Sequence, residues 1–462
     1  MKNGDVIRIE ITDVTNEAMG VGHFDKMAIF VPRSVRGDVL DVEITKLKKN
    51  YAYAKIKNIV SKSDKRCKPP CDAYKQCGGC QLMHMTYDEQ LELKKQFIFN
   101  SLTRLGGFKN LPEIHMLPAS NAFGYRNKMV FPVGKEKNEY VCGFYKIKSH
   151  DIVPLNLCPL GINSGEKIIA ALIKYIKECG ESAYDEKNHT GTVRRLFIRC
   201  AVKTGETMVV ISSNSDRLKD EKRLCKLIKD AEPSVCSIIL NIHKEKTNLV
   251  LGRENRTLFG APVINEQLCG FDYEISPNSF FQVNPTQTEK LYNKAIEFAD
   301  LNDGDTILDL YCGIGTISLA ASRLAKKVIG VEIVPDAIEN AKKNAQRNGV
   351  ENCTFYVGDA QTVVPRLLKD GAPPDKVILD PPRKGSDEVT LASICAAKPK
   401  KIVYVSCNPS TLARDLEYLC KNEYQISKIF GVDMFANTVH VETVVLLSQL
   451  KQKPDDYINV TI

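Results

Sequence analysis

The feature that most constrains the fold is a regular alternation of short apolar runs and helical segments after about residue 300. Apolar runs occur at TILDLY, KKVIGVEI, CTFYVGD, KVILD and KKIVYVSC, with helical stretches between them, and two further strands follow. Strands of about four to eight apolar residues separated by helices form parallel sheets. The pattern therefore predicts a doubly wound, Rossmann-like α/β domain over residues 284–462.

The rest of the chain predicts two further domains. In residues 1–60, VIRIEI, DVLDVEI and YAYAKI alternate apolar and polar residues between turn signals, which is typical of a small OB-like β-barrel that binds nucleic acid. A stabilising β-appendage with a solvated basic face is the alternative. The basic residues of this segment are Arg33, Arg36, Lys46, Lys48 and Lys49. Residues 61–283 mix strands and helices without strict alternation, as expected of an α+β domain.

Composition limits the class of protein without fixing its function. The 462 residues carry a formal net charge of +8, which suits an anionic partner such as RNA and equally an ordinary solvated surface. There is no signal-peptide pattern and no run of about 18 apolar residues, so we expect a cytoplasmic protein without a membrane segment. In that compartment the 16 cysteines are expected to be reduced thiols or metal ligands.

Three features indicate a cofactor crevice at the carboxyl ends of successive strands. Gly313 and Gly315 permit a tight turn before a helix, Glu332 ends the next strand, and Asp359 follows the third. A carboxylate at Glu332 can accept both ribose hydroxyls of an adenosine. Ser318 replaces the third glycine that a dinucleotide pyrophosphate requires, which favours S-adenosylmethionine over a nicotinamide cofactor.

Two further strand ends carry reactive side chains. Asp380 ends KVILD and Cys407 ends KKIVYVSC, so both are expected to face the crevice. Cys407 also precedes a helix, whose dipole is predicted to lower the pKa of the thiol. Glu442, an acid within an apolar strand, is a candidate base. Each has a plainer alternative: a buried structural cysteine, as we interpret Cys312, and an acid pointing outward from an edge strand.

Several motifs together resemble one family. SCNPSTLARDL, ILDPPRKG, the Q-V-N part of SFFQVNPTQTEKLY and HVETVVLL are similar to the RNA (uracil-5-)-methyltransferases, which make 5-methyluridine. The resemblance covers nearly the whole chain, with a TRAM-like barrel. It implies Cys407 as nucleophile and Glu442 as base. It also implies an S-adenosylmethionine site of Gln282, Tyr311, Thr316, Glu332, Asp359 and Asp380.

Two of these positions depart from the family pattern, because Thr316 and Asp359 stand where some members carry asparagine. Asp380 and Gln282 are also candidates for contact with the uracil.

Three alternative functions remain open. A non-catalytic RNA-binding protein would have no use for the Cys407–Glu442 pair, an amino-group methyltransferase would carry N-P-P-[YF] at the strand end, and a cytosine-C5 enzyme would place its cysteine after proline.

A cysteine-rich segment predicts a metal centre. Cys71, Cys77 and Cys80 follow the spacing C-x5-C-x2-C, and Cys158 precedes a proline. Four thiolates suit zinc or a [4Fe–4S] cluster, and spacing does not separate the two. CGGCQLMH resembles the family's iron–sulfur segment, which implies a [4Fe–4S] cluster on these four cysteines and leaves Cys67 outside it. We expect a structural or RNA-shaping role for the cluster.

The substrate expected from the resemblance is 23S rRNA, because members with both a TRAM-like barrel and the cysteine cluster resemble the 23S enzymes. The alternative is the T-loop uridine of tRNA, whose enzymes often lack one or both additions. The C5 and C6 atoms of a stacked base are inaccessible, so an unpaired uridine is expected. Nothing in the sequence indicates an obligate protein partner.

Overall fold

The computed structural model describes residues 1–450 apart from 148, 156, 163–164, 248 and 371–372, and the end of the predicted last domain, 451–462, lies outside these residues. The chain divides into two compact units. The first comprises residues 1–97, 118–289 and 433–440, and the second comprises 98–117, 290–432 and the chain from 441 onward. No helix in the described part is both long and apolar enough to cross a membrane.

The first unit opens with a closed barrel in the strand order β1-β2-β3-β5-β4. Its strands are β1 (Val6–Val14), β2 (Met19–Phe24), β3 (Met27–Pro32), β4 (Val39–Leu47) and β5 (Tyr51–Ser61). Alternate residues such as Ile29, Val31 and Val42 are fully buried inside it. The period of two in the sequence thus becomes an inward and an outward face, and the predicted small barrel is confirmed.

A seven-stranded sheet forms the centre of the first unit, in the order β13-β12-β11-β10-β7-β8-β9. Its strands are β7 (Lys128–Glu136), β8 (Glu139–Tyr145), β9 (Ile152–Pro154), β10 (Val193–Cys200), β11 (Thr207–Ser213), β12 (Val235–Ile242) and β13 (Glu254–Gly260). The pair β11–β12 is parallel and the others are antiparallel. This unit also contains η1 (Asp72–Lys75), α2 (Gly165–Cys179), α3 (Glu221–Ala231) and the hairpin β14 (Ile264–Leu268) and β15 (Phe271–Ile275). The mixed α+β character is confirmed.

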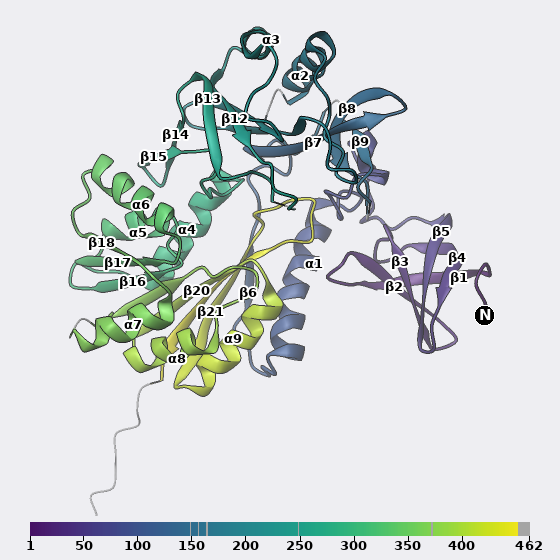
Figure 1. The fold of residues 1–462 in the computed structure, drawn as a ribbon. Coiled ribbons are helices and arrows are strands. Elements are labelled where there is room, and N and C mark those ends of the chain that lie inside the picture. The colour runs from purple at the N-terminus through teal and green to yellow at the C-terminus, as the bar shows by residue number, and fades with distance from the viewer. Residues whose placement is uncertain (148, 156, 163–164, 248, 371–372, 451–462) are drawn as a thin grey trace, which may run out of the picture. The chain divides into compact units, whose positions relative to one another are not determined.

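The second unit is an eight-stranded sheet in the order β18-β17-β16-β19-β20-β22-β21-β6. The strands are β16 (Thr306–Leu310), β17 (Lys327–Glu332), β18 (Cys353–Val357), β19 (Lys376–Leu379), β20 (Lys401–Ser406), β21 (Tyr424–Val432), β22 (Glu442–Gln449) and β6 (Ile114–Leu117). The helices are α5 (Thr316–Ser322), α6 (Pro335–Arg347), α7 (Ala360–Lys369), α8 (Glu388–Ala397) and α9 (Pro409–Lys421), and α4 (Pro285–Ala299) leads into them. In Figure 1, α5 and α6 lie on one side of the sheet and α7 to α9 on the other. This is the predicted doubly wound arrangement.

Helix α1 (Tyr87–Asn100), which continues into a π-helical turn (Ser101–Leu105), carries a buried ion pair within the first unit. Lys94 is fully buried, and its Nζ donates to Asp433 Oδ1 at 2.5 Å and to the Phe435 carbonyl at 3.0 Å. The hydroxyl of Tyr87 donates to Asp433 Oδ2 at 2.8 Å. These bonds hold segment 433–440 against α1, far from it in sequence.

Replacing Lys94 by Met should strongly destabilise the protein, because Asp433 would remain buried without its cation. We expect the free energy of unfolding to fall by about 3–5 kcal/mol, measured by urea denaturation. Lys95→Met, one position along at a half-buried site, serves as the control. The double variant Lys94→Met/Asp433→Leu should recover much of the loss. An unchanged stability in Lys94→Met would contradict this role.

Candidate active site

Six of the residues predicted from the sequence lie at one edge of the sheet of the second unit. Five of them end or follow the parallel strands, and the sixth begins β22, which runs antiparallel to β20 and so starts at the same edge. In strand order these residues are Asp359 (β18), Glu332 (β17), Tyr311 (β16), Asp380 (β19), Cys407 (β20) and Glu442 (β22). The order of the strands changes direction between β16 and β19, and ligands bind at such switch points in open α/β sheets.

The turn after β16 has an unusual backbone conformation. Gly313 and Gly315 have φ of +55° and +83°, and Tyr311, a non-glycine residue, has φ of +64°. A side chain at Gly315 would stand 3.2 Å from atoms of Ala341 and Leu319. The left-handed conformation at Tyr311 costs free energy, as often found at functional sites. Its hydroxyl is 3.0 Å from Ser386 Oγ, which fixes the ring at the edge of the crevice.

Glu332 links this turn to the start of α6. Its Oε2 accepts from the backbone N–H of Gly313 at 3.3 Å, and its Oε1 accepts from that of Val334 at 3.0 Å. Beside it, Ile333 and Val357 are 61% and 49% exposed. Exposed aliphatic side chains flanking a carboxylate form a surface suited to a flat base with a ribose. Sequence reasoning missed these two residues, although Ile333 directly follows the acid.

Ser318, at the position of the missing third glycine, has a partner of its own. Its hydroxyl donates to Asp309 Oδ2 at 2.5 Å, and both residues are buried. Burial raises the pKa of Asp309 to about 7, against the opposing effect of that hydrogen bond. The Ser318 hydroxyl therefore donates to a buried carboxylate behind the turn.

The remaining predicted cofactor residues have internal partners or lie elsewhere. Asp359 caps α7, accepting from the Gln361 backbone N–H at 3.2 Å. The Thr316 hydroxyl donates to Tyr292 Oη at 3.3 Å. Gln282 belongs to the first unit, where its carbonyl accepts from Asn127 Nδ2 at 3.2 Å.

Cys407, Glu442 and Asp380 interact electrostatically as a group. Ser406 pairs with Thr443 across β20 and β22, so Cys407 and Glu442 continue the same register. Glu442 is 4% exposed and lies on a strand between β20 and β21, so the alternative of an outward acid on an edge strand is wrong. Burial raises the pKa of Glu442, Asp380 raises it further, and Arg383 opposes the shift.

The pKa of Cys407 differs from the sequence expectation. Burial raises it to about 11, and the nearby Glu442 and Asp380 contribute in the same direction. The predicted lowering at the start of α9 is therefore outweighed by desolvation and two carboxyl groups. Arg383, which sequence reasoning did not select, is the cation that acts against both shifts.

The loop that carries Arg383 is clamped by α9, which explains why two of the motifs occur together. The Arg383 carbonyl accepts from Asn408 Nδ2 at 3.1 Å and from the Thr411 hydroxyl at 3.2 Å. Arg414 donates to the Ser386 carbonyl at 3.0 Å, while Asp415 accepts from the backbone N–H of Ser386 at 2.8 Å. The SCNPSTLARD helix thus holds the DPPRKGS loop next to Cys407.

The cysteine-rich segment lies in the first unit. The pKa of the Cys80 thiol is raised to about 12, mainly by burial and in part by three neighbouring thiols, those of Cys71, Cys77 and Cys158. Cys67 is not among them, and its thiol faces the Met83 carbonyl at 3.5 Å. Within the described residues, no group of three or more His, Cys, Asp or Glu side chains is arranged to hold a metal ion. The metal centre therefore stays a prediction.

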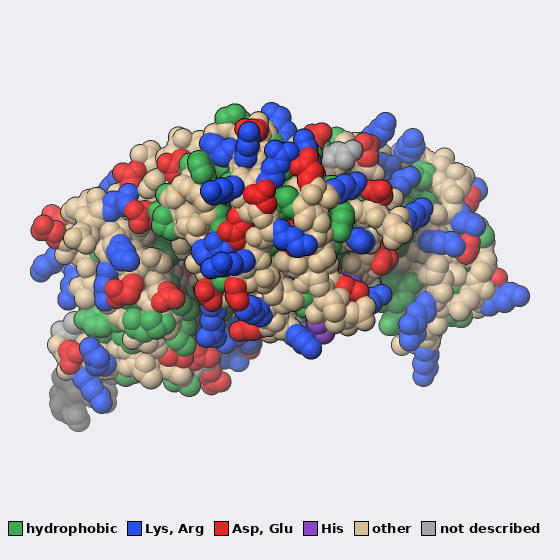
Figure 2. All heavy atoms as spheres, turned by 45° about the horizontal axis from the view of Figure 1, so that its top comes forward, with side chains coloured by type: hydrophobic (Ala, Val, Ile, Leu, Met, Phe, Trp, Pro, Cys, Tyr) green, Lys and Arg blue, Asp and Glu red, His purple; other side chains and the backbone are tan. Residues whose placement is uncertain are grey.

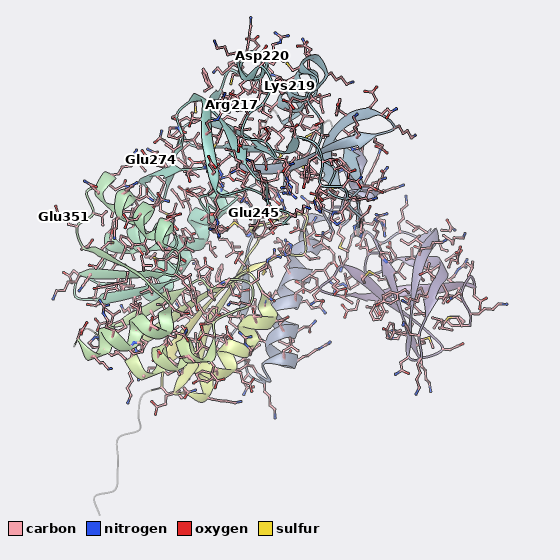
Figure 3. The ribbon with its side chains drawn as sticks, viewed as in Figure 1. Arg217, Lys219, Asp220, Glu245, Glu274 and Glu351 are labelled. Atoms are coloured by element: carbon pink, nitrogen blue, oxygen red, sulfur yellow. The ribbon has the colours of Figure 1, made fainter. Side chains whose placement is uncertain are left out.

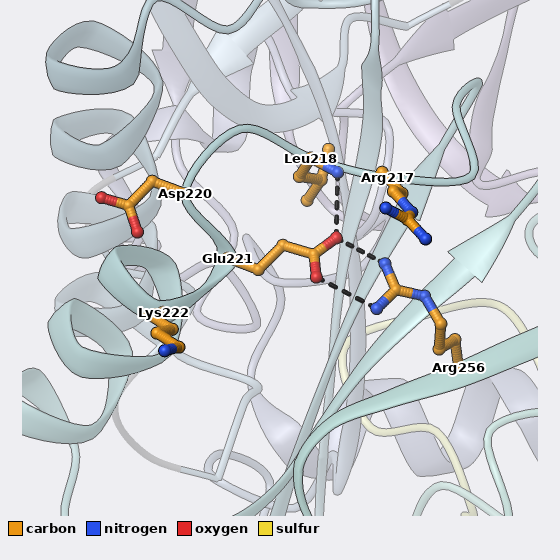
Figure 4. A pocket seen from close by; sticks show the side chains of 6 residues that line it. All are labelled: Arg217, Leu218, Asp220, Glu221, Lys222 and Arg256. Atoms are coloured by element: carbon orange, nitrogen blue, oxygen red, sulfur yellow. Dashed lines mark hydrogen bonds and ion pairs between the residues drawn. The ribbon is translucent and has the colours of Figure 1, made fainter.

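A separate surface hollow lies at the start of α3 in the first unit (Figures 3 and 4). Its lining residues are Arg217, Leu218, Asp220, Glu221, Lys222 and Arg256. Glu221 forms an ion pair with Arg256 and accepts from the Leu218 backbone N–H at 3.0 Å. None of the residues predicted to carry function lines this hollow, and its charges largely compensate one another.

Comparison with known proteins decides the family. Residues 86–360 match the family described as tRNA (Uracil-5-)-methyltransferase, residues 1–57 match the TRAM domain, and residues 301–452 match a methyltransferase domain. The chain belongs to the tRNA (uracil-5-)-methyltransferase family. A protein of Clostridium tetani named as an RNA methyltransferase is 44% identical over 98% of each chain, and one of Staphylococcus aureus is 41% identical over 95% of this chain and 97% of its own.

A solved structure supports the same family. The Pyrococcus abyssi tRNA (uracil-54, C5)-methyltransferase, in complex with S-adenosyl-L-homocysteine, is 32% identical, with a TM-score of 0.77, over 95% of this chain and 99% of its own. The present chain is thus an RNA methyltransferase with an N-terminal TRAM domain. The resemblance drawn from its motifs is confirmed.

Because folding raises the pKa of Glu442 above its ordinary 4.5, its proton stabilises the folded state. This contribution is fully present below the unfolded pKa and is lost as the pH rises through the folded value. Glutamine cannot ionise, so the stability of Glu442→Gln relative to wild type should increase as the pH rises from about 5 to about 8, by about 1–3 kcal/mol. Thermal melts across this range measure it.

The control is Glu417→Gln, which changes an exposed acid on α9 that pairs with Lys421. Its stability relative to wild type should vary much less with pH. Parallel curves for Glu442→Gln and wild type would contradict the raised pKa.

Proposed function

We propose that this enzyme methylates C5 of a uridine in RNA, with S-adenosylmethionine as methyl donor, Cys407 as nucleophile and Glu442 as general base. The observation that carries the proposal is the pairing of β20 with β22, which places the half-buried Cys407 beside the buried Glu442, with Asp380 close enough to raise the pKa of both. Other methyl transfers, such as those to amino groups, have no need of a thiol next to a buried acid.

The chemistry requires both groups. Uracil C5 is too weak a nucleophile to attack a sulfonium methyl, so the Cys407 thiolate first adds to C6, and C5 gains carbanion character. S-adenosylmethionine, when bound, supplies the methyl group that C5 takes. Glu442 then removes the C5 proton, the C5–C6 double bond reforms, and the Cys407 sulfur leaves with its bonding electrons.

The electrostatics of the site suit this order of events. Burial and the two carboxyl groups favour the protonated thiol, so Cys407 must lose its proton to solvent before the thiolate adds to C6. Glu442 must be ionised to act as the base, and the ionised form of a carboxyl whose pKa is raised is a stronger base toward carbon than a solvated glutamate. Arg383 lowers the pKa of both Cys407 and Glu442, so it favours the thiolate and the carboxylate.

The proposed cofactor site is the crevice from β18 to β19. Glu332 would accept the ribose hydroxyls, the exposed Ile333 and Val357 would flank the adenine, and the turn at Tyr311 would approach the amino-acid part. Thr316, Asp359, Asp380 and Gln282 complete the proposed set. The related structure in complex with S-adenosyl-L-homocysteine supports S-adenosylmethionine as the cofactor.

We propose 23S rRNA as the substrate, because the TRAM domain occurs together with the cysteine-rich segment. This substrate would place the enzyme in the cytoplasm. A specific observation favours tRNA as a second candidate. The solved tRNA enzyme matches 95% of this chain, so whole-chain architecture does not separate the two substrates. Either substrate must present its uridine unstacked.

Cys71, Cys77, Cys80 and Cys158 are the proposed ligands of a [4Fe–4S] cluster. The mutual influence of the four thiols supports this set, although the described residues contain no group arranged for a single metal ion. The ligands of a four-iron cluster stand further apart than those around one ion. Bound iron would keep the thiols deprotonated despite the raised pKa of Cys80.

Cys407→Ala should abolish methyl transfer and the covalent adduct with RNA containing 5-fluorouridine, in which C5 carries no removable proton. Glu442→Gln should methylate unmodified RNA but retain the adduct, because C5 deprotonation stalls. Denaturing gels of enzyme with labelled RNA show both. Cys420→Ala on α9 is the matched control and should behave as wild type. Turnover by Cys407→Ala would overturn the mechanism.

The cluster proposal is tested by the iron and sulfide content of anaerobically purified protein. Wild type should contain about four of each per chain, and Cys80→Ser should lose most of both. Cys67→Ser, a change in the same segment outside the four thiols, should retain them. A colourless protein loaded with zinc would show that the cluster is wrong.

A further inference from the structure

The outer surface of the barrel carries a group of three aromatic rings. Tyr51 and Tyr53 of β5 contact Phe30 of β3, with ring centroids 5.7 Å and 5.8 Å from that of Phe30. The two tyrosine rings lie 5.6 Å apart at 87° to each other. We call these three residues the aromatic face.

The barrel core does not account for these rings. The inward-pointing residues that follow Tyr51 and Tyr53 on β5 are the small Ala52 and Ala54, both buried, while the two tyrosines are 36% and 38% exposed. Phe30 is opposite Tyr53 in the parallel pairing of β3 and β5, so the rings share one outward surface. Large exposed aromatic side chains in contact with each other are typical of a surface that stacks on a ligand.

Unpaired positive charge borders the aromatic face. Lys46 lies in β4 opposite Tyr53, and Lys48 and Lys49 lie in the β4–β5 turn directly before Tyr51. All three are exposed. Among the described residues, none of the three forms a salt bridge. Further along β5, by contrast, Lys55 and Lys57 both pair with Glu43. Figure 2 shows Lys and Arg side chains projecting from the barrel, at the right of the view.

The other basic residues of this segment are engaged in holding the structure. Arg33 donates to the Lys75 carbonyl, and Arg36 pairs with Glu89 at 2.8 Å. Of the five basic residues singled out in the sequence, three are thus available to an anionic ligand, and they are the three next to the aromatic face.

We propose that the aromatic face and Lys46, Lys48 and Lys49 bind an unpaired stretch of the substrate RNA. Bases would stack on Tyr51 and Tyr53, and the lysines would contact the phosphates. Aromatic side chains can stack only on bases released from a helix, so this surface selects single-stranded RNA without reading its sequence. The inference deepens the proposed function, on which it rests for the identity of the RNA as substrate.

The test measures binding of the full chain to an unstructured RNA of about 12 nucleotides, by fluorescence anisotropy. Tyr51→Ala/Tyr53→Ala should raise Kd by about tenfold or more, whereas Tyr51→Phe/Tyr53→Phe, which keeps the rings, should stay within about twofold. Val60→Ala, an exposed apolar change on the same strand, is the control. Changing the three lysines to Gln should reduce the salt slope of log Kd by about 2.

Two results would overturn the proposal. One is an alanine pair that binds single-stranded RNA as tightly as Val60→Ala. The other is an alanine pair that loses single-stranded and double-stranded RNA equally, because stacking on free bases would then not be the cause. Crosslinking of RNA containing 4-thiouridine should also map to Tyr51 or Tyr53, and crosslinks confined to other residues would count against this face.

Methyl-transfer kinetics separate this proposal from the proposed function. The alanine pair should raise KM for the RNA and leave kcat unchanged at saturation. If wild type binds RNA through this face but transfers no methyl group, the chemistry is wrong and the surface stands. If the alanine pair keeps both KM and kcat, the surface is wrong and the chemistry stands.

Discussion

The insertion of β22 between β20 and β21 is the constraint on which the site depends. Because β22 runs antiparallel to β20, its first residue lies at the edge where the parallel strands end. Glu442 is therefore buried beside Cys407, and both come under the influence of Asp380. If β22 ran parallel to β20, its first residue would lie at the opposite edge of the sheet, far from Cys407. The strand β22 thus brings Glu442 to the proposed catalytic group.

Two networks hold that edge in place. Next to Cys407, α9 clamps the loop that follows Asp380, so the two motifs with unusual sequences are halves of one structure. On the side of the proposed cofactor site, Glu332 binds the glycine turn, and Ser318 forms a hydrogen bond with Asp309 behind it. At this edge Asp380 and Cys407 directly follow buried strands, Glu442 begins one, and the loop after Asp380 is hydrogen-bonded to α9 and its N-cap.

Much of this could be predicted from the sequence because strand ends carry strong local signals. The parallel sheet, the barrel and the strand-end positions of Asp380 and Cys407 follow from periodicity alone. The raised pKa of Cys407 did not, because desolvation depends on tertiary packing, whereas the helix effect is local. The exchange of segments 98–117 and 433–440 between the units was not anticipated either. Their assignment depends on long-range pairs such as Lys94–Asp433, which leave no periodic trace.

The most direct test of the central claim is tritium release from RNA labelled at uridine C5, with S-adenosylmethionine, on separate 23S rRNA, 16S rRNA and tRNA fractions. Methylation at C5 displaces the C5 hydrogen, so release that depends on S-adenosylmethionine reports this reaction. The account predicts release from the 23S fraction by wild type and none by Cys407→Ala. Release from tRNA alone would keep the mechanism and change the substrate. No release from any fraction, with cofactor binding intact, would contradict uridine C5 methylation.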